Sequence, residues 1–234
     1  MGVPIHHKYT IVLNASGQAS GSVKLTGKKT VSECGRGPQR TSREDWIEAA
    51  LDTLISEGVD SVKVLLIAEK LSCARSSFYW YFKNRAELLD ALLDHWQSTN
   101  AKSIVSKSLE PATSINAALI NVFECWIDES LFDTRLDFAI REWARRSGTV
   151  RRAMDISDSY ILDALTQMFE RYDFEKAEAE VRARIVYYTQ IGYNRMDPQE
   201  AMEQRVRRGP NYIYCMTGQP LSAAETASML GTQE

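Results

Sequence analysis

Residues 67–89 read IAEKLSCARSSFYWYFKNRAELL. Five consecutive aromatic residues, 78–82, lie at the centre of this stretch, with Arg75 before them and Lys83 and Arg85 after them. Aromatic side chains bury large apolar areas when a chain folds, whereas charged side chains are rarely buried without a partner. The stretch must therefore place some of its rings in a core and hold others beside positive charge.

The secondary structure of the aromatic run decides which rings are buried. On a helix of about 100° per residue, Phe78 and Phe82 share one face and the other rings point away from it or between. On a strand, Phe78, Trp80 and Phe82 would share a face. The aromatic content favours a strand, whereas the polar residues before the run and the cap-like Asn84 favour a short helix. The pattern alone leaves both interpretations open.

The segments around the aromatic run are typical of short helices joined by tight turns. Ser42 can cap a first helix with Asp45 three residues later, and Gly58 suits the end of that helix. Asp60 or Ser61 can cap a second helix. This second helix, a brief turn and the aromatic run as a third helix would have the dimensions of a helix-turn-helix.

The rest of the chain shows helix-length apolar periodicity, so we expect an all-α fold. A last helix is expected from Pro198, because proline suits a first turn, and Pro210 should kink or end it. The sequence contains no glycine-rich phosphate loop and no internal repeat. The other helices predicted in this part span 115–127, 136–146, 151–172 and 175–196.

The segment 58–93, which contains the quoted stretch, closely resembles the DNA-binding head of the tetracycline-repressor (TetR) family. The family pattern combines an I-A-x-x-L scaffold helix, a three-residue turn, a recognition helix that ends in aromatic-Tyr-x-x-Phe, a lysine, and a helix that opens with Leu-Leu. The resemblance covers about residues 41–95. It implies a three-helix head over 41–86 and a larger helical effector-binding and dimerisation domain over 87–234. Residues 1–40 would form a basic, flexible extension.

The resemblance implies two roles for the aromatic run. Phe78 and Phe82 would pack against Trp46, Ile67 and Leu71 in the core of the head. The front of the recognition helix would face base edges in the major groove, and neighbouring side chains would hold phosphates. The expected DNA contacts are Arg40, Arg43, Ser61, Lys63, Ala74, Arg75, Ser76, Ser77, Tyr79, Trp80, Tyr81 and Lys83.

The chain departs from the family pattern in the turn that aims the recognition helix. Ser72 stands where the family has glycine, and a left-handed serine would cost about 1 kcal/mol. Ala74 stands where the family has serine or threonine, and the missing cap should weaken the helix by roughly 1 kcal/mol. Leu65 and Leu66 are also unusually apolar for positions that are often exposed in the family.

Two segments of the body, 141–144 and 191–193, resemble one branch of the family. Aromatic residues at helical spacing in the body either belong to its core or line a ligand cavity, and the sequence leaves both open. The candidate cavity residues are Phe123, Trp126, Phe138, Trp143, Tyr160, Met168 and Tyr188. The last two long helices, about 176–196 and 199–217, are expected to form a four-helix bundle with a second chain. The candidate dimer contacts are Tyr187, Ile191, Met202 and Val206.

The formal net charge of −3 is unevenly distributed. Residues 1–85 carry twelve Lys/Arg and eight Asp/Glu, whereas residues 86–234 carry sixteen and twenty-three. A basic amino-terminal part on an acidic body is what a DNA-binding head would show. The four cysteines form no C-x-x-C pair, and the three histidines offer no zinc set. No stretch has the length of a membrane span or of a secretory signal.

The sequence thus predicts a DNA-binding transcriptional regulator in the cytoplasm. Its expected partners are double-stranded operator DNA, a second copy of itself and an unidentified small-molecule effector. A ligand-responsive repressor that binds a pseudo-palindromic operator as a homodimer is the favoured interpretation. An activator, or a regulator that senses no ligand, stays open on the same fold. A helical enzyme is the other alternative, but no nucleophile–base set supports it, and we expect no catalytic residues, cofactor, metal or membrane association.

Overall fold

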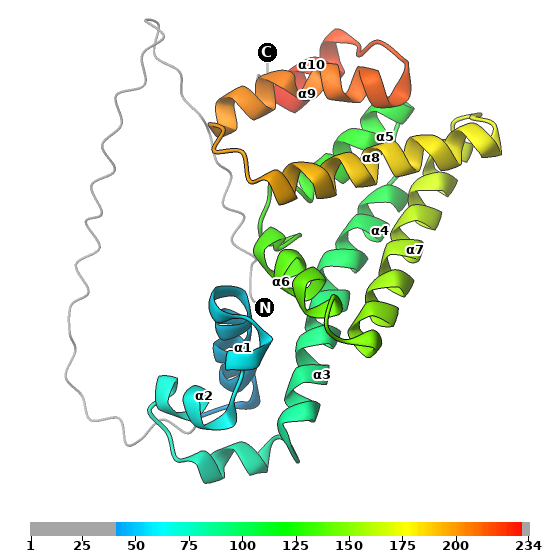
Figure 1. Ribbon diagram of the computed structural model, residues 1–234. Helices are drawn as coiled ribbons and strands as arrows, with labels where there is room; N and C mark the ends of the chain where they lie inside the picture. The colour runs from blue at the N-terminus through cyan, green and yellow to red at the C-terminus, as the bar shows by residue number, and fades with distance from the viewer. Residues whose placement is uncertain (1–40, 231–234) are drawn as a thin grey trace, which may run out of the picture.

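The computed structural model describes residues 41–230, and regular secondary structure in that range is entirely helical (Figure 1). The predicted all-α fold is confirmed. The expected extension over residues 1–40, which includes Arg40, lies outside the described residues. The α-helices are α1 (Arg43–Glu57), α2 (Val64–Lys70), α3 (Arg85–Trp96), α4 (Lys102–Leu109), α5 (Ile115–Glu124), α6 (Thr134–Ala144), α7 (Gly148–Glu170), α8 (Lys176–Met196), α9 (Met202–Thr217) and α10 (Ala223–Leu230).

Local sequence sets both ends of α1. The Oγ atom of Ser42 accepts a hydrogen bond from the Asp45 backbone N–H at 3.1 Å, and the Asp45 carboxylate accepts one from the Ser42 N–H at 2.6 Å. This confirms the predicted capping box. Gly58 ends the helix with a φ of 83°, a conformation that residues with a Cβ atom rarely adopt.

The second helix of the head begins later than the sequence pattern indicated. A 3-10 turn, η1 (Val59–Ser61), follows α1, and α2 starts directly after Lys63, which makes no side-chain cap. The prediction that Asp60 or Ser61 caps the second helix is therefore wrong. The physical reason is burial, because the chain must first bring Val62 into the core, where it is 0% exposed.

Buried apolar residues form two clusters. The first joins the head to α6 and the start of α7, with Phe78 and Leu92 packed in the same cluster as Leu136 and Met154. The second lies in the body among α4, α5, α7, α8 and α9. The expected boundary at residue 86 lies at the start of α3, whose buried side chains belong to the core of the head. Within residues 41–230, no helix is both long and apolar enough to cross a membrane.

One continuous rod connects the head to the body. A π-helical turn, η3 (Gln97–Ala101), joins α3 to α4, and Figure 1 shows the rod rising from the head into the body. Asn100 in this turn is 1% exposed. Its side-chain amide donates to the Asp133 carbonyl at 2.9 Å and accepts from the Asp133 N–H at 3.1 Å. Because Asp133 also caps α6, the π turn holds the start of α6 in place.

The carboxyl-terminal helices cover one end of the body. Helices α7 and α8 form an antiparallel pair, and α9 and α10 lie across α8 and α5 at the top of Figure 1. The last long helix, α9, starts at Met202 rather than at the predicted Pro198. It continues past Pro210 and ends at Thr217. Burial of Ile213 and Met216 offsets the hydrogen bond that proline cannot donate. The short helix α10 was not predicted.

Candidate nucleic-acid interface

The aromatic run forms a short 3-10 helix, η2 (Arg75–Trp80), which confirms the helical interpretation. Phe78 is 0% exposed and Phe82 is 1% exposed, and their stacked rings have centroids 5.3 Å apart. Trp46 of α1 meets the Phe78 ring edge-on at 5.2 Å. As predicted, both phenylalanines belong to the core of the head together with Ile67. They anchor the inner side of η2.

The opposite side of η2 faces solvent. Trp80 is 80% exposed and Tyr79 is 54% exposed. Arg75 is also exposed, and its Nη2 atom donates to the Tyr79 hydroxyl at 3.3 Å. Lys83, just beyond η2, has an exposed side chain as well. One short element and its flank therefore present two aromatic rings and two cations on a single outer surface.

Two of the expected contact residues are already engaged inside the head. The Ser77 hydroxyl donates to the Ala74 carbonyl at 2.7 Å, and its side chain is half-buried. The Tyr81 hydroxyl donates to the Thr41 carbonyl, and its ring packs against the core of the head. This corrects the expectation that Tyr81 turns outward with its neighbours. The hydrogen bond to Thr41 draws the ring inward, where it holds the start of α1.

The remaining expected contacts lie around the same outer surface or close to it in the head. Ala74 and Ser76 are exposed beside the start of η2, and Lys63 is exposed at the start of α2. Ser61 is half-buried in η1. Arg43 is exposed, and its guanidinium carbon lies 5.1 Å from the centre of the Phe82 ring in the core of the head. This cation–π contact holds the charged guanidinium itself beside the head.

The turn before η2 has the backbone strain that its sequence implied. Ser72 adopts a φ of 51°, in the left-handed region that favours glycine. Ala74 is extended and offers no side-chain oxygen to cap η2. Ser72 thus takes the conformation that glycine favours, and η2 begins without a side-chain cap, while the two expected energy costs stay predictions. Leu65 is 54% exposed and Leu66 is 36% exposed, so these two leucines do leave an apolar surface on α2.

Arg85 has a role that its sequence position did not indicate. Its guanidinium donates from Nε to the Val62 carbonyl at 2.5 Å and from Nη2 to the Val59 carbonyl at 2.6 Å. These bonds tie the start of α3 to η1 across the head. A half-buried arginine that satisfies two carbonyl groups is a structural tie, whereas the Lys83 side chain is exposed and makes no ion pair within residues 41–230.

Residues 47–92 match the family model described as "Bacterial regulatory proteins, tetR family". This chain carries a TetR-family head. The match lies on α1, α2, η2 and most of α3, which are the elements that build the outer surface around η2. The resemblance read from the sequence is therefore confirmed, and the TetR-type head is the part of the chain for which the relationship is strongest.

Curated relatives match mainly through this head. The chain is 42% identical over 53 residues to the tetracycline repressor protein class D of Escherichia coli, covering 23% of this chain and 24% of that protein. It is 33% identical over 98 residues to the HTH-type transcriptional regulator TtgR of Pseudomonas putida, covering 40% of this chain and 45% of that protein. The chain thus matches from about a quarter to under half of the length of these relatives.

Solved structures share the fold over most of the chain. Salmonella enterica GusR superposes with a TM-score of 0.60 at 18% identity, covering 75% of this chain and 93% of that chain. Mycobacterium smegmatis AmtR superposes with a TM-score of 0.52 at 20% identity, covering 85% of this chain and 98% of that chain. At these identities the likeness shows that the body has the same helical architecture, and it carries no assignment of a ligand.

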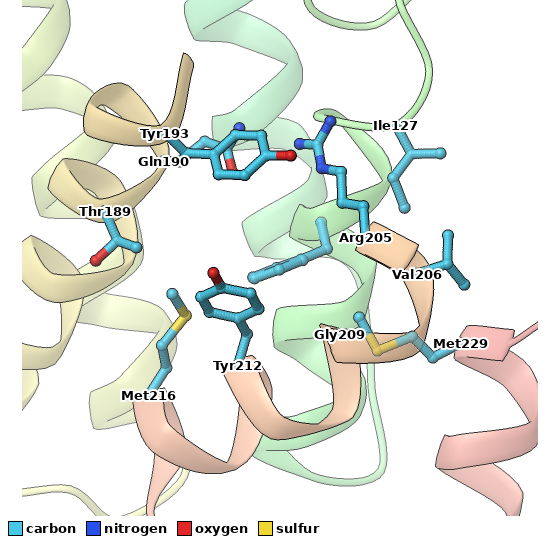
Figure 2. A pocket seen from close by; sticks show the side chains of 11 residues that line it. Ile127, Thr189, Gln190, Tyr193, Arg205, Val206, Gly209, Tyr212, Met216 and Met229 are labelled. Carbon is cyan, nitrogen blue, oxygen red and sulfur yellow. The ribbon is translucent and has the colours of Figure 1, made fainter. Parts of the chain in front are cut away.

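The body contains a hollow that only partly matches the expected cavity residues. It lies between α5, α8, α9 and α10 (Figure 2). Among the expected residues, Phe123 lines it, while Trp126 and Met168 are buried in the second core. Tyr160 and Tyr188 are 68% and 55% exposed, so neither faces a cavity. The lining residues are Phe123, Ile127, Thr189, Gln190, Tyr193, Arg205, Val206, Gly209, Tyr212, Met216 and Met229.

The other two expected cavity residues lie beside α6. Phe138 and Trp143 line a cleft between α6 and the end of α1, next to the head. Phe138 also lines a second cleft that contains several arginines from α6, α7 and α8. The Arg195 guanidinium carbon lies 4.3 Å from the centre of the Phe138 ring. These two aromatic residues therefore belong to the junction between head and body, away from the hollow.

A buried polar network crosses this junction. The Arg141 guanidinium donates to Asp137 at 2.7 Å and binds both carboxylate oxygens of Asp158 at 2.9 and 3.0 Å. The Trp96 indole N–H donates to Asp137 at 3.1 Å, and the Tyr187 hydroxyl donates to Asp158 at 2.7 Å. Burial raises the pKa of Asp137, and the charge of Arg141 opposes that rise. The network links α3, α6, α7 and α8.

This network also corrects one expected dimer contact. Tyr187 is 1% exposed within a single chain, and burial raises its pKa above the usual range. It cannot reach a second chain, so its assignment to a dimer contact is wrong. Ile191 lines the arginine-containing cleft, and Val206 lines the hollow. Met202 is 46% exposed.

A different set of side chains forms an apolar stripe on the outer face of α8. Val181 is 56% exposed, Ile185 44%, Tyr188 55% and Met196 83%. Their spacing of four, three and eight residues places them on one side of the helix, opposite the buried Ala183. Only the structure distinguishes this stripe from the buried side, because both sides of α8 are rich in apolar residues.

Proposed function

We propose that this protein is a DNA-binding transcriptional regulator whose TetR-type head reads operator DNA through η2. The observation that carries the proposal is the division of η2 into two sides. Phe78 and Phe82 are buried in the core, while Arg75, Tyr79 and Trp80 project outward. A rigid element that presents cations and rings on one face suits the major groove and its phosphates.

The outer surface of the head divides into base-reading and phosphate-binding groups. Arg75, with Ser76 and Ala74 beside it, is proposed to face base edges, since arginine pairs well with guanine O6 and N7. Tyr79 and Lys83 are proposed to hold phosphates. Trp80 is proposed to lie against the sugar-phosphate backbone or a thymine methyl group. Lys63, Ser61, Arg43 and Arg40 are proposed to add contacts on either side.

The regulator is proposed to act as a homodimer on a pseudo-palindromic operator. One short helix reads few base pairs, and a twofold dimer places two heads on successive half-sites. The apolar stripe of α8 supports this, because exposed apolar rows on a long helix are typical of interaction surfaces. Helix α9, with its exposed Met202, is proposed to complete a four-helix bundle with the partner chain.

The protein is further proposed to be a cytoplasmic, ligand-responsive repressor without catalytic activity. A ligand that prefers one arrangement of the body shifts the equilibrium between arrangements by its difference in affinity. The polar network around Arg141 supports such coupling, since it joins α3, which belongs to the core of the head, to α8. Release of DNA would then follow from realignment of the two heads.

DNA binding is tested with a fluorescent fragment of the protein's own promoter in anisotropy titrations. Affinity is expected to fall by orders of magnitude between about 50 and 200 mM salt, because phosphate contacts release counterions. Lys83→Ala and Tyr79→Ala should each weaken binding to every sequence, whereas Arg75→Ala should relax preference at one base position.

Lys102→Ala is the matched control, since Lys102 is an exposed lysine on α4, outside the head. It should bind the promoter fragment as the wild type does. Failure of the wild-type protein to bind the fragment at low salt would reject the proposed function. Equal losses of DNA affinity for Lys83→Ala and Lys102→Ala would show that any surface lysine contributes equally. The proposed role of the surface around η2 would then be rejected.

A further inference from the structure

The hollow in the body is lined by side chains from four helices. Figure 2 shows Tyr193 of α8 and Tyr212 of α9 on opposite sides of it, with Arg205 at one edge. Its enclosed volume is small, about 40 Å³, and the wider hollow of about 520 Å³ includes space open to solvent, so a ligand would also occupy that open part. Most of the lining is aromatic, aliphatic or thioether, which suits an apolar molecule of small size.

The absence of a side chain at Gly209 allows Met229 to pack closely in one wall of the hollow. Gly209 is buried on α9, and Met229 of α10 packs directly against its Cα. A Cβ atom at position 209 would lie 2.3 Å from the Met229 Cε and 2.9 Å from its sulfur. The thioether can occupy this place only because residue 209 has no side chain. The wall is flexible at this point, since methionine adapts readily to irregular surfaces.

Arg205 is the chemical exception in this lining. Its side chain is half-buried, and its guanidinium carbon lies 4.7 Å from the centre of the Tyr193 ring. Within residues 41–230, Arg205 has no ion-pair partner and no side-chain hydrogen bond. Glu200, the carboxylate that precedes α9, is bound by Arg208 and accepts from the Tyr193 hydroxyl at 3.1 Å. Arg205 therefore brings an uncompensated positive charge to an apolar hollow.

We propose that this hollow binds a small carboxylic acid with an apolar body, with the carboxylate on Arg205 and the body between Tyr193 and Tyr212. This deepens the proposed function, because it names the chemical class of the effector. A guanidinium in a half-buried place gains most from a ligand that brings the opposite charge. A neutral ligand would leave Arg205 unpaired, and a cationic ligand would be repelled by it. The apolar body of the ligand replaces water on the rings and thioethers.

The position of the hollow gives the acid a path to the rest of the molecule. A ligand here contacts α8 and α9 together, the two helices assigned to the dimer. Gln190 lines the hollow from α8, and Tyr187 lies one helical turn earlier on the same helix in the buried polar network. A change in how α8 meets α9 is therefore transmitted to the junction with the head.

The proposal is tested by isothermal titration calorimetry with three probe acids, 2-naphthoate, 4-phenylbutyrate and decanoate. At least one acid is expected to bind the wild type more tightly than 2-naphthalenemethanol, the neutral counterpart of the first probe. Arg205→Gln should weaken acid binding by about tenfold or more, in keeping with a lost charge-assisted contact. Arg205→Lys should recover part of the loss, because it restores the charge without the planar fork.

Arg207→Gln is the matched control, since Arg207 is an exposed arginine on the same helix that does not line the hollow. It should bind the acids as the wild type does. Val206→Trp, which fills the hollow from its wall, should weaken the acids and the alcohol alike. Circular dichroism melting confirms that each variant is folded before titration.

Three results would overturn the proposal. The first is that no probe acid binds at millimolar concentration. The second is that the wild type and Arg205→Gln bind the acids with equal affinity. The third is that Arg205→Gln and Arg207→Gln lose acid affinity equally. Titrations on protein without DNA keep this test separate from the proposed function. Acid binding without promoter binding would reject the proposed regulatory function and support the acid site. Promoter binding without acid binding would support the regulatory function and reject the acid site.

Discussion

The aromatic core of the head and the polar network at the junction are held together by different forces. In the head, Trp46, Phe78 and Phe82 pack ring against ring. At the junction, Arg141 is surrounded by carboxylates and a hydroxyl group. The stabilisation from ring packing changes little with pH, because it comes from removing apolar surface from water. A buried ionic network is sensitive to pH and to the loss of any one member.

The two regions give the molecule one part that is held by apolar packing and one part that is held by paired charges. The aromatic core fixes the orientation of η2, because nothing in it titrates and its members interlock. The polar network joins several charged or polar partners from α3, α6, α7 and α8, so its hydrogen bonds depend on the relative positions of these helices. The head therefore has a core without charged groups, whereas the junction depends on charged groups that must stay paired.

The largest effect should come from the aromatic core. Phe78→Ala removes a ring that is 0% exposed, and we expect a loss of about 4 kcal/mol in the free energy of unfolding, because the site leaves a cavity. Urea denaturation followed by circular dichroism measures the loss. Tyr79→Ala is the matched neighbour, since its ring is 54% exposed and its loss should change stability by under about 0.5 kcal/mol. Similar losses in the two variants would contradict the two-sided description of η2.

The polar network should respond almost as strongly, and with a pH dependence that the aromatic core lacks. Arg141→Met leaves Asp137 and Asp158 without their cation, and we expect a loss of about 3 kcal/mol at neutral pH. Arg151→Met is the control, because Arg151 forms an exposed i,i+4 pair with Asp155. Its effect should stay under about 0.5 kcal/mol.

The sign of the pH dependence follows from Asp137. Burial raises its pKa, and removal of Arg141 leaves that rise unopposed. A carboxyl group whose folded-state pKa exceeds its unfolded value stabilises the fold below the unfolded value, and that contribution is lost as pH rises through the folded value. The deficit of Arg141→Met should therefore be smaller at pH 5 than at pH 8. A deficit that is constant across this range would show that Asp137 does not titrate in the variant.

A gain of stability is expected in the turn that aims η2. Ser72→Gly removes the strain of a left-handed serine at a φ of 51°, and we expect a gain of up to about 1 kcal/mol. In a chain of this size that gain raises the melting temperature by roughly 2–4 °C. Differential scanning calorimetry measures it. Ser76→Gly on η2 is the control, because Ser76 has an ordinary φ and should lose stability instead.

The smallest effect should come from the ion pair that bridges head and body on the surface. Arg146 and Asp60 lie 3.3 Å apart, and both side chains are largely exposed. Arg146→Gln should change the free energy of unfolding by less than about 0.5 kcal/mol, since exposed pairs are screened by water and salt. Thermal melts at low and high salt check this. A loss of several degrees would mean that the surface pair carries part of the junction now assigned to the polar network.

Local sequence determined the head to a large degree. The capping box at Ser42 and the glycine at position 58 each act through neighbours in the chain, so each could be predicted from local sequence. The pattern around Phe78 and Phe82 left helix and strand open, and the family resemblance favoured the helix. The left-handed conformation of Ser72 was expected from the glycine that the family pattern has at this position. The start of α2 was missed, since the burial of Val62 depends on contacts across the head.

The side-chain environments of the body were decided by tertiary structure. Aromatic residues such as Phe123, Trp126 and Tyr188 occur at similar helical spacing, yet one lines a hollow, one is buried and one is exposed. Their places depend on how α5, α8 and α9 cross. The sequence pattern records which residues are apolar, but only packing decides which apolar side meets another helix and which side stays open.

By itself, the sequence determined an all-helical chain through its caps, turns and helix-length apolar faces, and its resemblance to the TetR family indicated the type of head. Only the tertiary structure decided that Tyr187 is buried with Arg141, that an apolar stripe remains on α8, and that Arg205 lines a hollow without an ion-pair partner among residues 41–230. Charged and aromatic side chains take their roles from partners far away in the chain. Those partners become known only once the helices are packed.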